Sequence, residues 1–136
     1  MSDVDYLKND QDEIFRRLVE FEEIIDGRVQ DVDYWHLLFV FHKLTDLVFQ
    51  HEQNKKFIMD SSNEYYLRTP LSRLFMDQRR VRGHIRVINQ AILSKDINFI
   101  RVALDTDGRM VISNIKNHIS REELILDRVL FLRMGS

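Results

Sequence analysis

Two histidines begin four-residue spacings that could carry chemistry. His118 is followed four residues later by Glu122. His51 is followed at the same distance by Lys55, and Glu52 comes directly after His51. Residues four apart lie on one face of an α-helix, so His118 and Glu122 would present an imidazole and a carboxylate together. Both groups bind metals, and His51 with Glu52 on a second helix would extend a mononuclear site.

The alternative is that both histidines are polar core residues satisfied by hydrogen bonds. A protonated lysine has no lone pair and would repel a dication nearby, and we expect Lys55 and Arg82 to share the layer of the histidines. We therefore favour the hydrogen-bonded interpretation over a metal site. The three other histidines fall off the inner stripes by helical spacing and are expected at the surface or rim: His36, His42 and His84.

The elements that would position these residues are four helices, predicted from apolar residues spaced three and four apart. Their expected bounds are about 8–26, from Asp31 or Asp33 to about 59, from Thr69-Pro70 to about 93, and from Ser94 or Asp96 onward. Gly27 is a typical residue just after a helix, and Gly108 weakens the last helix. The long connection spans Asp60 to Thr69. The sequence thus predicts an all-α, four-helix up-down bundle forming one domain, residues 1–136.

An internal repeat links the candidate residues to this bundle. The pattern that begins at Asp10-Gln11 recurs at Asp77-Gln78, an offset of 78 − 11 = 67. His51 and His118 are separated by the same 67 residues. One offset for both pairs of helices indicates two pseudo-repeated helical hairpins around a pseudo-twofold axis.

These interrupted stripes resemble the hemerythrin-like (HHE cation-binding) four-helix bundle family. In that family the odd helices usually carry an acidic-His pair before an apolar stripe, and the even helices carry HxxxE. Imidazoles and carboxylates from four inward faces then hold a di-iron centre. The resemblance covers nearly the whole chain and rests on short motifs.

Carried over residue by residue, the family's ligand set is degenerate here. His118 and Glu122 match HxxxE, whereas His51 is followed by Lys55 in place of the carboxylate. Other ligand positions are also replaced: Gln11, Gln78 and Arg82. A glutamine amide is a weak neutral ligand, so the resemblance implies a bundle that has lost di-iron binding. We expect no cofactor, with iron as the alternative, and we expect Lys55 to replace the lost cation beside Glu122.

Composition and charge argue against several classes of function. The formal net charge of −2 and the absence of cysteine argue against nucleic-acid binding, disulfides and thiolate sites. The polar N-terminal residues lack the features of a secretory signal, and no apolar run approaches the length of a membrane span, so we expect a cytoplasmic protein without a membrane partner. No Ser–His–acid arrangement, phosphate loop or catalytic carboxylate pair stands out, so we expect no enzyme.

The start of the second predicted helix and the end of the fourth are apolar nearly all round. The candidates for binding a protein partner or a second copy of the chain are Trp35, Phe39, Phe131 and Leu132. We therefore expect a non-catalytic regulatory or protein-interaction module, for which bacterial anti-sigma regulators of helical architecture offer a fold-level analogy. The alternative is a metal-binding hemerythrin-like protein that responds to iron, oxygen or nitric oxide.

Overall fold

The computed structural model describes residues 3–27, 34–61 and 72–134. Their helices are α1 (Asp3–Ile25), α2 (Tyr34–Ser61), α4 (Gln78–Ser94), α5 (Ile97–Ala103), the π-helix η2 (Leu104–Gly108) and α6 (Arg109–Met134). The described part of the chain contains no strand. The predicted all-α class is confirmed.

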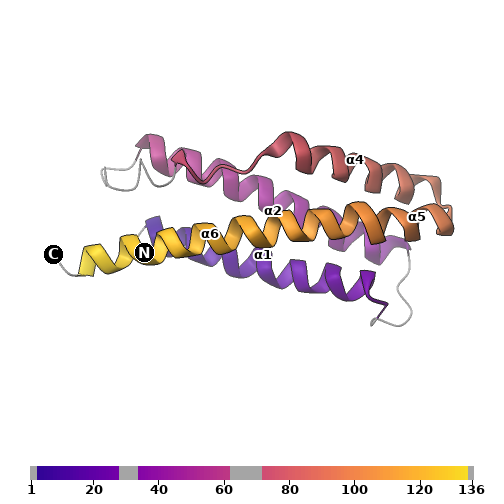
Figure 1. Ribbon diagram of the computed structural model, residues 1–136, viewed down its shortest axis with the longest axis horizontal. Helices are drawn as coiled ribbons and strands as arrows, with labels where there is room; N and C mark the ends of the chain where they lie inside the picture. The colour runs from indigo at the N-terminus through magenta and orange to yellow at the C-terminus, as the bar shows by residue number, and fades with distance from the viewer. Residues whose placement is uncertain (1–2, 28–33, 62–71, 135–136) are drawn as a thin grey trace.

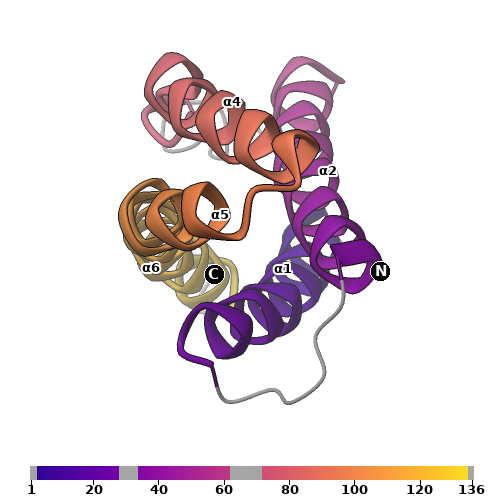
Figure 2. The same cartoon turned by 90° about the vertical axis from the view of Figure 1, so that its right-hand side faces the viewer.

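The helices form an antiparallel bundle. In Figure 1 the chain runs to the right along α1, returns along α2, runs right again along α4 and comes back along α5, η2 and α6. Figure 2, which views the bundle along its length, shows α1, α2, α4 and the column formed by α5 and α6 around a common axis. Helix α1 packs against α2 and α6, and α4 packs against α6.

The first two helices agree closely with the sequence pattern. Helix α1 begins at Asp3, earlier than predicted, because Val4 and Leu7 continue its buried stripe. Gly27 follows its end with φ 70°, and its N–H bonds the carbonyl of Ile24 at 3.1 Å, as expected of a helix-terminating glycine. Helix α2 ends within two residues of the predicted end. Its predicted caps, Asp31 and Asp33, lie outside the described residues.

The helix predicted from Thr69-Pro70 is interrupted before α4, although Ser72, inside the predicted range, is helical. That dipeptide and residues 62–71 lie outside the description, but residues 74–77 are not helical and α4 begins only at Gln78. Asp77 caps it by accepting a hydrogen bond from the N–H of Arg79. The physical reason for the late start is that the backbone of Leu74 and Met76 bonds buried side chains of α2 instead of its own helix.

The elements α5, η2 and α6 follow one another without a break, and the winding changes from α to π and back to α. Asp96 caps α5 by accepting from the N–H groups of Asn98 and Phe99, in agreement with one of the two predicted caps. The predicted weakness at Gly108 coincides with the end of the π-helix η2. A Cβ at Gly108 would lie 2.9 Å from Ile25 Cδ1. The missing side chain therefore lets this column approach α1 closely.

A buried polar layer divides the apolar interior into two cores. In the larger core the rings of Phe21 and Phe41 lie 5.3 Å apart. The smaller core is made by Val4, Leu7, Ile58, Leu74, Leu126 and Val129. Buried between them along the helices are Gln11, His51, Glu52, Lys55 and Glu122. This polar layer contains most of the ligand positions considered in the sequence.

Candidate functional site

Lys55 is the centre of the polar layer and is fully buried. Its Nζ donates to Glu52 Oε1 at 2.7 Å, to Glu122 Oε2 at 2.7 Å and to the Leu74 carbonyl at 2.9 Å. An ammonium has three protons, so these three acceptors use all of them. A fourth neighbour, His118 Nε2, is also 2.9 Å away. Because no proton of Lys55 is left for it, His118 bonds other groups.

His118 also lies close to Glu52 and Glu122, the two carboxylates that Lys55 contacts. Its Nε2 lies 2.9 Å from Glu52 Oε1 and 3.3 Å from Glu122 Oε2. Burial lowers the pKa of His118, but hydrogen bonds to Glu122 and Glu52 outweigh burial and the repulsion from Lys55, so the pKa is raised overall. His118 therefore acts as a donor to the carboxylates.

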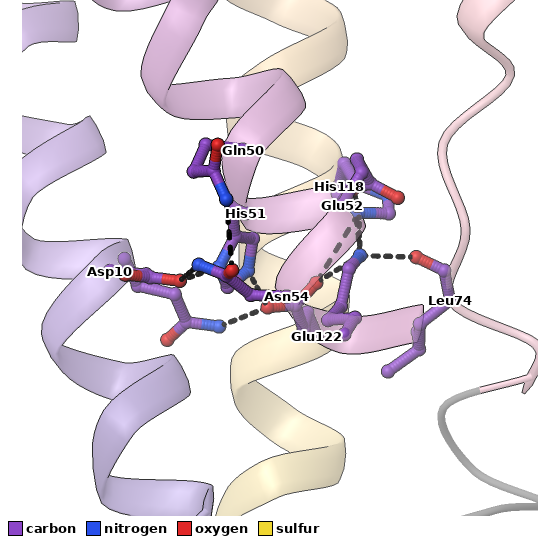
Figure 3. Close-up of polar contacts among 10 residues, drawn as sticks. Asp10, Gln50, His51, Glu52, Asn54, Leu74, His118 and Glu122 are labelled. Carbon is purple, nitrogen blue, oxygen red and sulfur yellow. Dashed lines mark hydrogen bonds and ion pairs between the residues drawn. The ribbon is translucent and has the colours of Figure 1, made fainter. Parts of the chain in front are cut away.

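His51 joins the cluster from the side facing α1. Its Nδ1 lies 2.9 Å from Asp10 Oδ2, and its Nε2 contacts Glu122 Oε1. Asp10 also accepts from Asn54 Nδ2 at 3.0 Å, as Figure 3 shows. Burial lowers the pKa of His51, but the bonds to Asp10 and Glu122 raise it above its ordinary value. Each ring nitrogen of His51 thus contacts a carboxylate: Nδ1 contacts Asp10 and Nε2 contacts Glu122.

Glu122 receives the densest set of donors, although it is fully buried. Gln11 Nε2 donates to its Oε1 at 2.9 Å, in addition to the contacts from His51 and Lys55. Burial raises its pKa, but hydrogen bonds from His118 and His51 reverse that effect and hold the pKa far below its usual range. Glu122 is therefore an anion whose two oxygens are both satisfied.

Glu52 is held in a similar way by the connector before α4. Its Oε2 accepts the backbone N–H of Met76 at 3.2 Å. Burial raises its pKa, but the bond to His118 and the charge of Lys55 lower it overall. With Asp10, Glu52 and Glu122 facing Lys55, His51 and His118, three carboxylates oppose three basic groups. Such matching is what makes buried charge tolerable.

The same geometry tests whether a metal fits here. Glu52, His118 and Glu122 are the group of potential ligands that the described residues bring together, with their ligand atoms within 4.8 Å of one another. The Nζ of Lys55 lies 2.7–2.9 Å from an atom of each. The ammonium thus lies among the atoms that would bind a cation, and the cluster as built does not fit a metal.

Two predicted ligand positions, Gln78 and Arg82, lie outside this cluster. Gln78 Oε1 accepts from the guanidinium of Arg82 at 3.3 Å. Arg82 is exposed and covers the ring of Phe49 at 4.6 Å. The expectation that Arg82 shares the layer of the histidines is therefore wrong. Because α4 begins only at Gln78, the backbone of the preceding connector closes this side of the cluster instead of helical side chains.

Sequence reasoning missed part of the cluster. Asp10 is part of the repeated Asp-Gln motif, and its neighbour Gln11 was a predicted ligand position on the same turn of helix. The bond between Asp10 and His51 was not predicted. Asn54 carried no signal beyond its place one residue before Lys55. The remaining histidines agree with a rim or surface position: His36 and His42 are exposed, and half-buried His84 contacts Asp107 at 2.8 Å.

This chain matches no protein-family model, no curated protein and no solved structure in the three comparisons made. No helix in the described ranges is long and apolar enough to cross a membrane. Functional inference therefore rests on the chain's own residues and on the geometry of the cluster.

We predict that Lys55 and Glu122 are strongly coupled in stability. Lys55→Met should lower the free energy of unfolding by on the order of 3 kcal/mol, because it leaves buried carboxylates unpaired. Adding Glu122→Gln should recover part of that loss, and only part, because Glu52 stays charged. Urea unfolding of the two single variants and the double variant measures the coupling. The matched control is Lys56→Met at the exposed neighbouring lysine, which should change stability by less than about 0.5 kcal/mol. Additive effects at Lys55 and Glu122 would refute the pairing.

We also predict a pH window of stability. The pKa values of His51 and His118 are raised above 6.5 on folding, so their contribution is complete below about 6.5 and is lost as pH rises through the folded values. The pKa values of Glu52 and Glu122 are lowered below 4.5, so theirs is present above about 4.5 and is lost as pH falls. Urea midpoints measured across pH should therefore decline on both sides.

Variants can identify which groups cause the loss of stability at high pH. This alkaline decline should flatten in the double variant His51→Gln with His118→Gln and persist in His42→Gln, because His42 is exposed. An unchanged alkaline decline in the double variant would mean that other groups cause it.

Proposed function

We propose that this chain is a non-catalytic regulatory or protein-interaction module whose bundle carries a tethered ammonium where a hemerythrin-like bundle would hold metal. The observation that carries the proposal is the position of Lys55 Nζ among Glu52, His118 and Glu122. A covalently attached cation balances the buried carboxylates without a diffusible ion. A cytoplasmic location is part of this proposal.

The orientation of Gln11 supports the loss of a di-iron centre. Its amide nitrogen donates to Glu122, so this residue serves the carboxylate as a hydrogen-bond donor. Two irons require several anionic bridges and imidazoles with free lone pairs. Here both nitrogens of His51 and both oxygens of Glu122 already have partners within the protein.

The burial of the cluster also argues against catalysis. A general acid or base must reach the proton that it transfers. Lys55 and Glu122 are fully buried, and only 11% of the His118 side chain is exposed. The perturbed pKa values arise from bonds within the cluster. Structural ion networks perturb pKa values in the same way as active sites do, so the cluster is better explained as a structural device.

The second candidate is a metal-binding protein that responds to iron, oxygen or nitric oxide. One observation favours it: the ligand atoms of Glu52, His118 and Glu122 are close enough to bind one ion. For that to happen, Lys55 must lose its proton or leave the cluster. The two candidates therefore differ in what Lys55 does.

We predict that the purified protein carries no stoichiometric iron, and that replacing the tethered cation creates metal affinity. In Lys55→Glu with Gln11→His, a carboxylate and an imidazole replace the lysine and the amide, which should produce saturable zinc or iron(II) binding. The control variant, Lys56→Glu with Gln11→His, keeps Lys55 and should bind neither. Metal content by emission spectroscopy and calorimetric titration provide the measurements.

Folding supplies a second readout, because the first variant concentrates negative charge and can require metal to fold. Circular dichroism with and without zinc should then show metal-dependent helicity. About two irons per chain in the wild-type protein after anaerobic reconstitution would overturn the proposal and favour the second candidate.

The candidate interface residues do not form one surface. Trp35, Phe39 and Phe131 are 70%, 58% and 76% exposed, and the side chain of Leu132 lies outside the description. Trp35 and Phe39 belong to the start of α2, whereas Phe131 belongs to the end of α6, at the other end of the bundle in Figure 1. The two apolar helix ends predicted from sequence therefore lie apart, because α2 and α6 run in the same direction through the bundle.

We predict that the region at the start of α2 mediates association with a protein partner or a second copy. Trp35→Ser with Phe39→Ser should abolish that complex while leaving helicity intact, because both side chains are exposed. Phe131→Ser is the matched control at the opposite end and should leave the complex unchanged. Sedimentation and circular dichroism give the two readouts. A strictly monomeric wild-type chain that captures no partner, or a loss of helicity in the double variant, would contradict the prediction.

A further inference from the structure

A second polar feature lies beside the ion cluster, on the side facing α4 and α6. It is a pocket of about 320 Å³, bounded by the connector 75–77, the first turns of α4 and the middle of α6. His118 lines this pocket while its Nε2 faces the cluster. His118 thus belongs both to the pocket lining and to the cluster.

Two arginines from different helices line the pocket. Arg80 reaches it from α4 and Arg121 from α6. Neither has a hydrogen bond or an ion pair with any residue in the described ranges, whereas Arg109 bonds both Asp26 and Asp105. The carboxylate in the lining, Asp77, accepts from the N–H of Arg79 as the cap of α4. The lining therefore carries excess positive charge in a chain of net charge −2.

A third donor comes from Asn114 on α6. Its Nδ2 is buried, lies in a residue that lines the pocket, and has no hydrogen-bond partner among the described residues. Buried amide donors in folded proteins nearly always have an acceptor. An anionic oxygen in the pocket would satisfy this donor together with the two guanidinium groups.

Part of the pocket lining is apolar and lies next to the cluster. Phe75 and Val81 line the pocket, and the ring of Phe75 lies 5.4 Å from Lys55 Nζ. Met76, between the cluster and the pocket, donates its N–H to Glu52. The ion cluster therefore holds the connector in the position that closes the pocket.

We propose that this pocket binds the phosphate group of a small organic molecule. Two guanidinium groups match the two charges of a phosphate monoester, and their planar donors suit its several oxygens. The volume is in the range of small-molecule sites, and the apolar wall fits the organic part of the ligand. Three donor groups in the lining, those of Arg80, Arg121 and Asn114, suit the three terminal oxygens of a phosphate monoester better than the two oxygens of a carboxylate. This site requires no assumption about the metal or the protein partner.

The test is calorimetric titration of the full chain with phenyl phosphate, inorganic phosphate and benzoate. We expect phenyl phosphate to bind saturably, more tightly than inorganic phosphate and at least tenfold more tightly than benzoate. Arg80→Gln and Arg121→Gln should each weaken phenyl phosphate binding about tenfold. Both arginines are exposed, so the variants should remain folded, as circular dichroism will verify.

The matched controls are Arg86→Gln and Arg128→Gln, at exposed arginines on the same two helices that do not line the pocket. Neither should change the affinity. In NMR spectra, phenyl phosphate should shift the side-chain amide of Asn114 and leave that of Asn89, away from the pocket on α4, unchanged. Equal losses in the control variants would overturn the proposal, because they indicate attraction to any basic surface. Benzoate binding as tight as that of phenyl phosphate would overturn the assignment to phosphate.

Discussion

The constraint on which the rest of the structure depends is the neutralisation of two buried carboxylates by the ammonium of Lys55. Glu52 and Glu122 come from α2 and α6, and neither could stay charged in an apolar interior without a partner. Lys55 contacts both at 2.7 Å. Because each bond has a narrow range of length, the two helices are fixed in register at this layer. The imidazoles of His51 and His118 complete the charge balance.

This layer also explains the break before α4. The third proton of Lys55 goes to the carbonyl of Leu74, and Glu52 accepts the N–H of Met76. Helical geometry would commit both backbone groups to bonds within the helix. The connector therefore remains extended across the cluster, and α4 starts at Asp77-Gln78. For the same reason Gln78, a ligand position in the resemblance, bonds Arg82 outside the cluster.

Sequence patterning predicted the helices because apolar spacing is a local property, repeated along each turn. It also indicated which turns carry polar residues, since His51, Lys55 and Glu122 interrupt apolar stripes. The 67-residue offset relates Lys55 to Glu122, and these residues are in contact. Spacing could not predict the bonds made by Asp10 or by the backbone of the connector. The bonds of Asp10 depend on how α1 and α2 face each other, and those of the connector depend on where a non-helical segment lies. No periodic pattern encodes either.

A tethered ammonium and a bound metal both place positive charge beside buried carboxylates, but they differ in whether the cation can leave. A metal can leave or change its oxidation state, whereas Lys55 cannot leave without moving the backbone of α2. The cluster is therefore a constant of the fold, and it is unsuited to sense a diffusible ion. The regulation that we propose for this chain would therefore act where binding is reversible. The pocket lined by Arg80 and Arg121 is the site that we propose for such binding, and its lining includes His118 and the connector bonded to Glu52. A ligand there would act on the same residues that hold the helices in register, so the rigid cluster becomes the route by which binding reaches the bundle.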